Sequence, residues 1–212
     1  MITKEKYDEL ISTLHRQNAT LVAVSKLQFP EKIETLYEFG HRDFGENYVQ
    51  ELLEKKEMFP ADIHWHFIGH LQSNKVKYIA PFIHLIHGVD SEKLLKEIDK
   101  QAAKAGRQID VLLQVFIADE ETKFGMNEHE VDEVMQKKEL FINVRIRGLM
   151  GMASFSEDME KVGKEFDFLK SIYDKYPGFN ILSMGMSADY ETAIAHGSNM
   201  VRIGSLVFGH RH

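Results

Sequence analysis

The sequence predicts a closed (β/α)₈ barrel preceded by one extra helix. Short apolar, strand-like runs alternate with amphipathic helical segments along the whole chain, and eight such runs can be counted. The connections between them are short. A repeated strand-then-helix order implies parallel strands, and eight units around a buried middle favour a closed barrel. A doubly wound open sheet is the alternative fold.

Each expected element rests on its hydrophobic period. The expected strands are Leu21–Ser25, Arg42–Gly45, His64–Ile68, Ile83–His87, Asp110–Ile117, Val144–Leu149, Asn180–Ser183 and Asn199–Ile203. The expected helices between them include Glu31–Phe39, Asn47–Glu57, Ser91–Ala105, Glu128–Lys138 and Glu157–Tyr176. The extra helix lies within residues 1–18, where Tyr7, Leu10 and Leu14 share one face.

Capping residues mark several helix boundaries. Ser91 stands before an apolar helical pattern, and the other cap-like residues are Ser73, Asn127 and Ser187. Glycines fall where helices are expected to end, at Gly40, Gly106 and Gly197. No linker or low-complexity tract interrupts the chain, so we expect a single domain over residues 1–212.

Composition limits the possible functions. The 212 residues, 43% of them hydrophobic, suffice for one packed core. The absence of cysteine excludes disulfides, thiolate catalysis and thiolate metal ligands. With a net charge of −7 and no long run of Lys or Arg, we expect no nucleic-acid or membrane partner. No signal-like core or bilayer-length apolar stretch is present, so a cytoplasmic location is expected.

Lys26 is a candidate nucleophile at the mouth of the expected barrel. The carboxyl ends of all eight strands point to this mouth, where barrel active sites lie. Lys26 ends the first apolar run, and an amine in that place can form a Schiff base. An isolated lysine at a strand end is more often a solvated side chain. Burial and a nearby arginine would lower the pKa of Lys26 and favour the nucleophile.

The last two strands end in turns suited to a phosphate. Ser187 follows the seventh strand, and Arg202, Gly204 and Ser205 close the eighth. Backbone N–H groups at Gly/Ser turns that enter helices bind anions, and barrel enzymes hold phosphate near these two strands. An ordinary tight turn is the alternative. Arg202 needs an acceptor, which is a protein carboxylate or a ligand atom. Together with Lys26, these turns suggest a phosphorylated aldehyde.

The histidines around the third strand do not predict a metal site. His64 and His66 share a strand face and His70 lies four residues beyond His66, but no Asp/Glu-rich motif stands beside them. Core or rim histidines are the expected role. Methionines such as Met184 either fill the core or form soft walls around a ring.

Six segments in colinear order between Leu21 and Gly209 resemble the YggS/PROSC family of pyridoxal-phosphate-binding proteins. They are Ala23–Lys26, Phe44–Glu51, Trp65–Lys75, Arg147–Met150, Ser183–Ser187 and Gly197–Gly204. This family is similar to the N-terminal barrel domain of alanine racemases and lacks their second domain. The resemblance implies pyridoxal 5'-phosphate (PLP) as the cofactor.

The resemblance also implies roles for individual residues. Lys26 would hold PLP as a Schiff base, and Arg202 would face the pyridine nitrogen. The phosphate would be held by Ser187, Gly204 and Ser205. The ring pocket would be lined by Asn47 and His66, with Met184 beside it.

Arginine opposite the pyridine nitrogen limits the chemistry. Its permanent charge favours the unprotonated nitrogen and weakens PLP as an electron sink. Racemisation also needs an acid/base group on each face, and in the racemases the second group comes from the other domain. The resemblance therefore implies a monomeric PLP homeostasis protein that releases PLP to apoenzymes and has no catalytic turnover.

Two alternatives remain open from the sequence. One is a PLP-dependent amino-acid racemase or lyase, and the other is a Schiff-base aldolase-type barrel acting on a sugar phosphate. Lys75 and Lys123 are further amines in expected loops, where solvated side chains are the usual role. A second lysine that holds PLP transiently also remains open.

Overall fold

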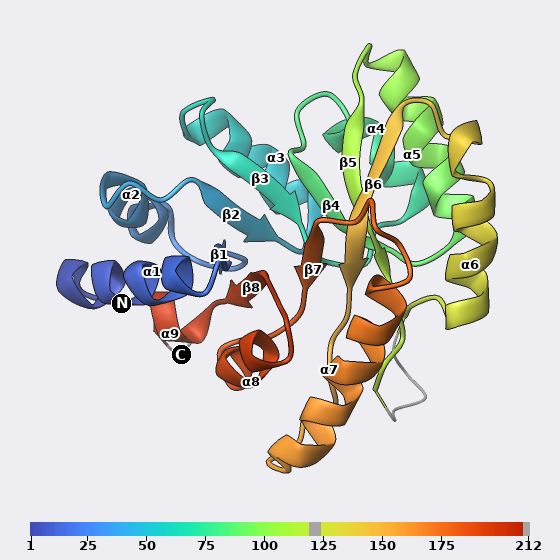
Figure 1. The fold of residues 1–212 in the computed structure, drawn as a ribbon. Coiled ribbons are helices and arrows are strands. Elements are labelled where there is room, and N and C mark those ends of the chain that lie inside the picture. The colour runs from blue at the N-terminus through green and yellow to red at the C-terminus, as the bar shows by residue number, and fades with distance from the viewer. Residues whose placement is uncertain (119–123, 210–212) are drawn as a thin grey trace.

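The computed structural model describes residues 1–118 and 124–209 and contains a closed barrel of parallel strands (Figure 1). The barrel follows chain order from β1 to β8, and β8 pairs with β1 to close it. The predicted (β/α)₈ fold is confirmed, and the open sheet is excluded. The strands are β1 (Thr20–Val24), β2 (Asp43–Glu46), β3 (His64–Phe67), β4 (Leu85–Val89), β5 (Ile109–Gln114), β6 (Val144–Met150), β7 (Ile181–Ser183) and β8 (Met200–Ile203).

Helices cover the outside of the barrel, and α1 (Lys4–Arg16) is the expected extra helix before β1 (Figure 1). The others are α2 (Pro30–Glu38), α3 (Val49–Met58), α4 (Val76–Ile79), α5 (Glu92–Lys104), α6 (Glu128–Gln136), α7 (Met159–Tyr173), α8 (Tyr190–Ala195) and α9 (Ser205–Phe208). Two 3₁₀ turns cover Ser73–Lys75 and Lys138–Leu140. Within the described ranges, the helices are too short or too polar to cross a membrane.

Two of the predicted helix caps are confirmed, and in both the capping side chain accepts a backbone N–H from the first turn of its own helix. Asn127 forms a capping box with Glu130 at the start of α6, and Ser91 accepts the Leu94 N–H at the start of α5. The predicted helix ends at Gly40, Gly106 and Gly197 all have positive φ, as a left-handed C-terminal residue requires.

Two predicted helix starts are wrong. Ser73 is the first residue of a 3₁₀ turn whose N-cap position is Gln72, and this turn has no side-chain cap. The N-cap position of α8 is Asp189, and the hydroxyl of Ser187 instead accepts the Gly204 N–H at 3.2 Å. The Ser187 side chain thus serves a contact between two loops, which local sequence does not specify.

Alternating strand residues divide the core into two parts. In β1, Leu21 and Ala23 pack outward against the helices, whereas Val22 points into the barrel. The apolar residues of the interior are Val22, Leu85, Leu112, Met150 and Met200. The same alternation points Ser183 and Arg202 inward, since their neighbours Leu182 and Val201 belong to the outer core. The barrel interior is therefore partly polar.

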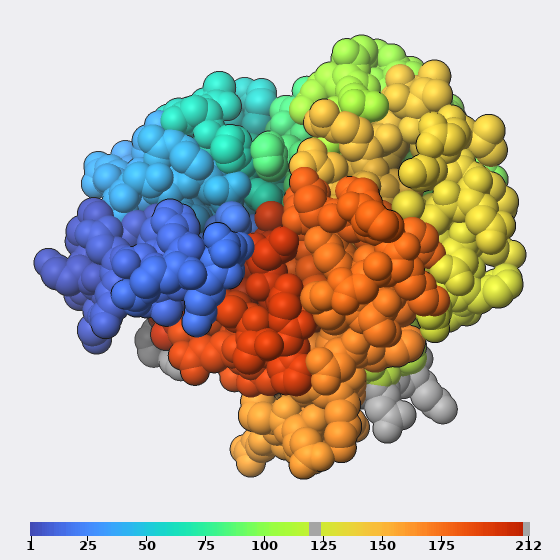
Figure 2. All heavy atoms as spheres, viewed as in Figure 1, coloured from blue at the N-terminus to red at the C-terminus, as the bar shows by residue number. Residues whose placement is uncertain are grey.

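The two ends of the described chain meet beside the barrel. The Ile2 N–H donates to the Val207 carbonyl at 2.8 Å, which joins the start of the chain to α9. Figures 1 and 2 show α1 lying against the C-terminal segment. The extra helix thus covers the barrel where β8 meets β1 and helps to hold the end of the chain in place.

A buried ionic cluster supports the end of β1. The ammonium of Lys55, in α3, lies 2.8 Å from Glu46 Oε1 and 2.6 Å from Glu51 Oε1, and it donates to the Ser25 carbonyl at 2.7 Å. The Ser25 hydroxyl also donates to Glu46 Oε1 at 2.6 Å. Burial raises the pKa of Glu46, and the nearby Lys55 charge opposes this shift. Lys55 therefore stabilises two carboxylates and also bonds the carbonyl of Ser25, the residue before Lys26.

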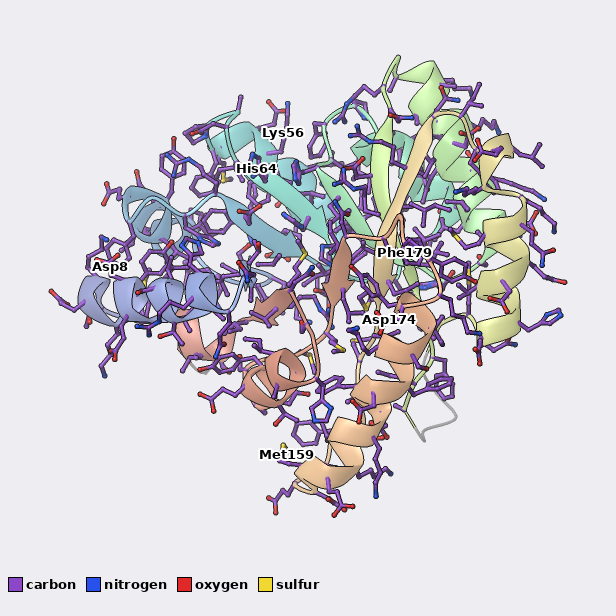
Figure 3. All side chains as sticks on the ribbon, in the orientation of Figure 1. Asp8, Lys56, His64, Met159, Asp174 and Phe179 are labelled. Atoms are coloured by element: carbon purple, nitrogen blue, oxygen red, sulfur yellow. The ribbon has the colours of Figure 1, made fainter. Side chains whose placement is uncertain are left out.

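We expect Lys55→Ala to lower the free energy of unfolding by about 3–5 kcal/mol, because it leaves buried carboxylates without their cation. Urea denaturation followed by circular dichroism measures this change. The matched control is Lys56→Ala, since Lys56 lies exposed on the same helix (Figure 3), where it pairs with exposed Glu57 and lies 5.7 Å from the centroid of the Phe82 ring. Equal denaturation midpoints for the two variants would contradict a stabilising role for Lys55.

Candidate functional site

A cavity of about 890 Å³ opens at the carboxyl ends of the strands. Its walls come from the ends of β1 and β8 and from the loops after β6 and β7. Five of the predicted site residues line it: Lys26, Ser187, Arg202, Gly204 and Ser205. The predicted convergence of the first and last strands at one mouth is therefore present in the structure.

The backbone around Lys26 is held in an unusual conformation. Leu27 has φ of 57°, in the left-handed region that non-glycine residues rarely adopt, at a cost of about 1–3 kcal/mol. The carboxylate of Glu51 accepts the Leu27 N–H at 2.6 Å, and the Gln28 N–H donates to the Ser25 carbonyl at 3.1 Å. Because Glu51 also pairs with Lys55, the ionic cluster fixes the turn that places Lys26 on the cavity wall.

Arg202 lies at the cavity with its side chain 4% exposed. Its Nη1 donates to the Ser183 carbonyl at 2.9 Å and the Ser183 hydroxyl at 2.6 Å, and its Nη2 donates to the Gly151 carbonyl at 3.0 Å. Burial lowers the pKa of Arg202 to about 10, so the guanidinium stays charged at pH 7.

The carboxylate partner considered for Arg202 is not found among residues 1–118 and 124–209, where no Asp or Glu oxygen comes within ion-pair distance. A guanidinium has five N–H donors, and three of those on Arg202 have acceptors in the described protein. The remaining donors have no acceptor in the part of the chain that the structure describes.

A chain of hydrogen bonds runs from Arg202 through the barrel interior. Ser183 Oγ lies 3.2 Å from His87 Nδ1, His87 Nε2 lies 2.9 Å from His66 Nδ1, and His66 Nε2 lies 3.0 Å from Asp43 Oδ1. Arginine only donates hydrogen bonds, and an ionised carboxylate only accepts them. With neutral imidazoles, each group therefore donates a hydrogen bond to the next one along the chain, from Arg202 to Asp43. Burial lowers the pKa of His87 well below its usual value, which keeps that ring neutral.

Three predicted ring-pocket residues lie away from the cavity wall. His66 is buried within this hydrogen-bond chain, and Met184 is fully buried in the outer core. Asn47 lines a separate surface cavity together with His70 and Lys75, and its buried Oδ1 has no partner in the described part of the chain. Lys123 lies outside the described residues.

The turns after β7 and β8 form one surface of the cavity. The hydrogen bond from the Gly204 N–H to Ser187 Oγ joins them, and Asp189 Oδ1 accepts the Met186 N–H at 2.5 Å. Ser205 begins α9, and the first N–H groups of a helix have no acceptor within it. This arrangement suits an anionic group.

The loop after β6 forms the outer rim. The buried carboxylate of Glu165 accepts the N–H and the hydroxyl of Ser154, each at 2.6 Å, and so ties this loop to α7. Beyond it, the Phe155 side chain is 93% exposed and Met159 lies at the outer tip of α7 (Figure 3). An apolar, open rim therefore surrounds a polar floor.

Sequence reasoning missed His87 and Glu165. His87 lies in an apolar strand, two residues after Leu85. Alternate strand residues share a face, so the available signal was that His87 points into the barrel like Leu85, whereas Ile86 points outward. Glu165 lies in an amphipathic helix, where nothing in the sequence distinguishes it from a solvated carboxylate.

The alanine racemase N-terminal domain family matches residues 4–212. The pyridoxal phosphate homeostasis protein of Aquifex aeolicus is 41% identical over 199 residues, which cover 91% of this chain and 87% of that protein. The structure of PipY from Synechococcus elongatus without PLP has a TM-score of 0.91 and 32% identity, covering 97% of this chain and 99% of that chain. PipY with PLP bound has a TM-score of 0.85 and 31% identity, covering 95% and 99%.

These matches extend over almost the whole chain, and they confirm the resemblance that the sequence motifs indicate. The closed eight-stranded barrel agrees with them. The chain belongs to the family of pyridoxal phosphate homeostasis proteins, within the alanine racemase N-terminal domain family.

Proposed function

We propose that this protein binds PLP reversibly and supplies it to PLP-dependent apoenzymes, acting as a monomer. One observation carries the proposal: the amine of Lys26, the guanidinium of Arg202 and the Ser187–Gly204 turn pair line a single cavity. These groups match the aldehyde, the ring nitrogen and the phosphate of PLP, respectively. Among relatives, PipY has been solved with PLP bound, and the Aquifex aeolicus protein is named a pyridoxal phosphate homeostasis protein.

The residues fit PLP in size and in chemistry. A cavity of about 890 Å³ lies within the usual range of small-molecule sites, about 300–1,000 Å³. The buried Arg202 retains N–H donors without a described protein acceptor, and a ring nitrogen supplies a lone pair for them. Ser187, Gly204 and Ser205 supply a hydroxyl and backbone donors for the phosphate.

Lys26 would hold the cofactor covalently. Its amine would hold the aldehyde of PLP as a Schiff base, with release of one water, and hydrolysis of that bond would free the cofactor again. The fixed turn at Leu27 directly follows Lys26 and would hold the backbone of Lys26 in place. The exposed rim around Phe155 leaves a path for the cofactor to enter and leave.

Arg202 would disfavour catalysis on the bound cofactor. PLP supplies an electron sink whose strength depends on protonation of its ring nitrogen. Arg202 is charged at pH 7 and is anchored by Ser183 and Gly151, so it favours the unprotonated nitrogen. These residues therefore support storage and release rather than turnover.

We expect Lys26→Ala to abolish the visible absorption of the Schiff base and its trapping by borohydride, because the amine is lost. Absorption spectra and peptide mapping after reduction measure both effects. Lys75→Ala is the matched control, since Lys75 lies at the separate cavity beside Asn47. A reduced adduct on another lysine, with the band intact in Lys26→Ala, would show that Lys26 is not the anchor.

We expect Ser187→Ala to weaken PLP binding by about 1–3 kcal/mol, the usual value of a hydrogen bond to a charged group. Pyridoxal, which lacks the phosphate, is expected to bind much more weakly than PLP. Equilibrium dialysis with both ligands tests this. The control is Ser171→Ala, an exposed serine on α7 that bonds only the Phe168 carbonyl. Equal affinity for PLP and pyridoxal would refute a phosphate site at these turns.

We expect the PLP-loaded protein not to racemise alanine at an enzymatic rate, because Arg202 weakens the electron sink. The enantiomer ratio and solvent-deuterium incorporation are followed for L-alanine, with free PLP as control. Turnover on the order of 1 per second or faster would favour a PLP-dependent racemase instead.

A further inference from the structure

Metal-ligating side chains gather at the opposite end of the barrel from the cavity. Asp43 is the first residue of β2 and His64 the first of β3, while His66 lies two residues further along β3. His84 directly precedes β4. Figure 3 shows His64 and Met159, which marks the mouth side, on opposite sides of the barrel. This cluster therefore belongs to the amino-terminal ends of the strands and is separate from the proposed PLP site.

The ligand atoms of this cluster converge. One ligand atom from each of Asp43, His66 and His84 lies within 4.8 Å of the other two. Asp43 Oδ1 lies 3.0 Å from His66 Nε2, and the rings of His66 and His84 have centroids 5.3 Å apart. Tetrahedral zinc with bonds of about 2.0–2.2 Å holds its ligand atoms about 3.3 Å apart. Small side-chain adjustments of His84 therefore suffice to complete the site.

Asp43, His66 and His84 present oxygen and nitrogen donors of the kinds that zinc binds. Burial favours a raised pKa for Asp43, but the hydrogen bond from His66 and the nearby imidazoles outweigh it and lower the pKa to about 2. Burial lowers the pKa of His84 to about 4.

An outer set of hydrogen bonds orients these ligands. His66 Nδ1 lies 2.9 Å from His87 Nε2, and His41 Nε2 lies 2.8 Å from the Asp43 carbonyl. The hydroxyl of Tyr7 lies 3.1 Å from His41 Nδ1 and fixes that ring in turn. Metal-binding histidines usually have such a partner on the second ring nitrogen. With a metal on His66 Nε2, the proton of His66 moves to Nδ1 and is donated to His87 Nε2, while the proton of His87 moves to its own Nδ1 and is donated to Ser183 Oγ.

The cluster is open to ions from solution. The side chain of His64, which stacks on His84 with ring centroids 4.4 Å apart, is 48% exposed. His84 itself is exposed, while His66 is buried at the inner end. His70, four residues after His66 in the sequence, does not belong to this cluster. Its ring bonds Asp90 and stacks on Phe124.

We propose that Asp43, His66 and His84 bind one divalent transition-metal ion of the zinc class. The carboxylate and two imidazoles supply the nitrogen and oxygen donors that zinc prefers, and water completes the coordination. The ion ties together the starts of β2, β3 and β4. This site takes a metal independently of whether PLP occupies the mouth.

Cobalt and zinc titrations test the site in tag-free, chelator-treated protein that carries its bound PLP. We expect one equivalent of Co²⁺ to give visible d–d absorption at pH 7 and Zn²⁺ to displace it. His84→Ala is expected to lower Zn²⁺ affinity by about tenfold or more. Because His84 is exposed, this variant is expected to fold, which circular dichroism checks.

His129→Ala is the matched control, because it removes an imidazole whose side chain is 81% exposed on α6. Its Zn²⁺ affinity is expected to equal that of the original protein. PLP absorption in the same samples keeps any loss of cofactor separate from a loss of metal. The proposal is overturned if the protein binds no Co²⁺ or Zn²⁺, or if His84→Ala binds Zn²⁺ as tightly as His129→Ala.

Discussion

The buried charge of Arg202 is the constraint around which the barrel interior is arranged. A guanidinium inside a protein is strongly destabilising unless acceptors replace water, and no carboxylate in the described ranges contacts it directly. Carbonyl groups and the Ser183 hydroxyl accept its hydrogen bonds, and two histidines extend the chain to Asp43. The opposite charges of Arg202 and Asp43 therefore stand at the two ends of one polarised network, which explains why this barrel is not filled by apolar side chains alone.

The mouth of the barrel depends on a second buried network. The pairing of Lys55 with Glu46 and Glu51 fixes the end of β1 and the strained turn at Leu27. Strain of this kind persists only where surrounding contacts hold it, and here it lies directly after Lys26, which lines the cavity. Lys26 and Arg202 line the cavity together with Glu157 and Asp189, so in this protein of net charge −7 an anionic ligand would be held by individual donors rather than attracted by net charge.

The sequence indicated the site only in part. Lys26, Ser187, Arg202, Gly204 and Ser205 line the cavity because each lies at the carboxyl end of a strand or within the four residues after it, and strand ends can be located from local periodicity. The positions of Asn47, His66 and Met184 were not predictable in this way. Whether a residue beside a strand end faces the mouth, the interior or the outer core depends on the stagger between strands, and local sequence carries little information about it.

The order of elements and the closed barrel were determined by the sequence alone, because alternating periods of two and 3.6 residues are local properties of the chain. Helix ends such as Gly40 and the capping box at Asn127 were local in the same sense. Only the tertiary structure decided which polar groups meet. His66 reaches both His87 and Asp43, and Lys55 reaches Glu46, through pairings set by barrel register and helix packing. These contacts join residues on different elements, so their physical cause is the closure of the barrel rather than any segment of the sequence.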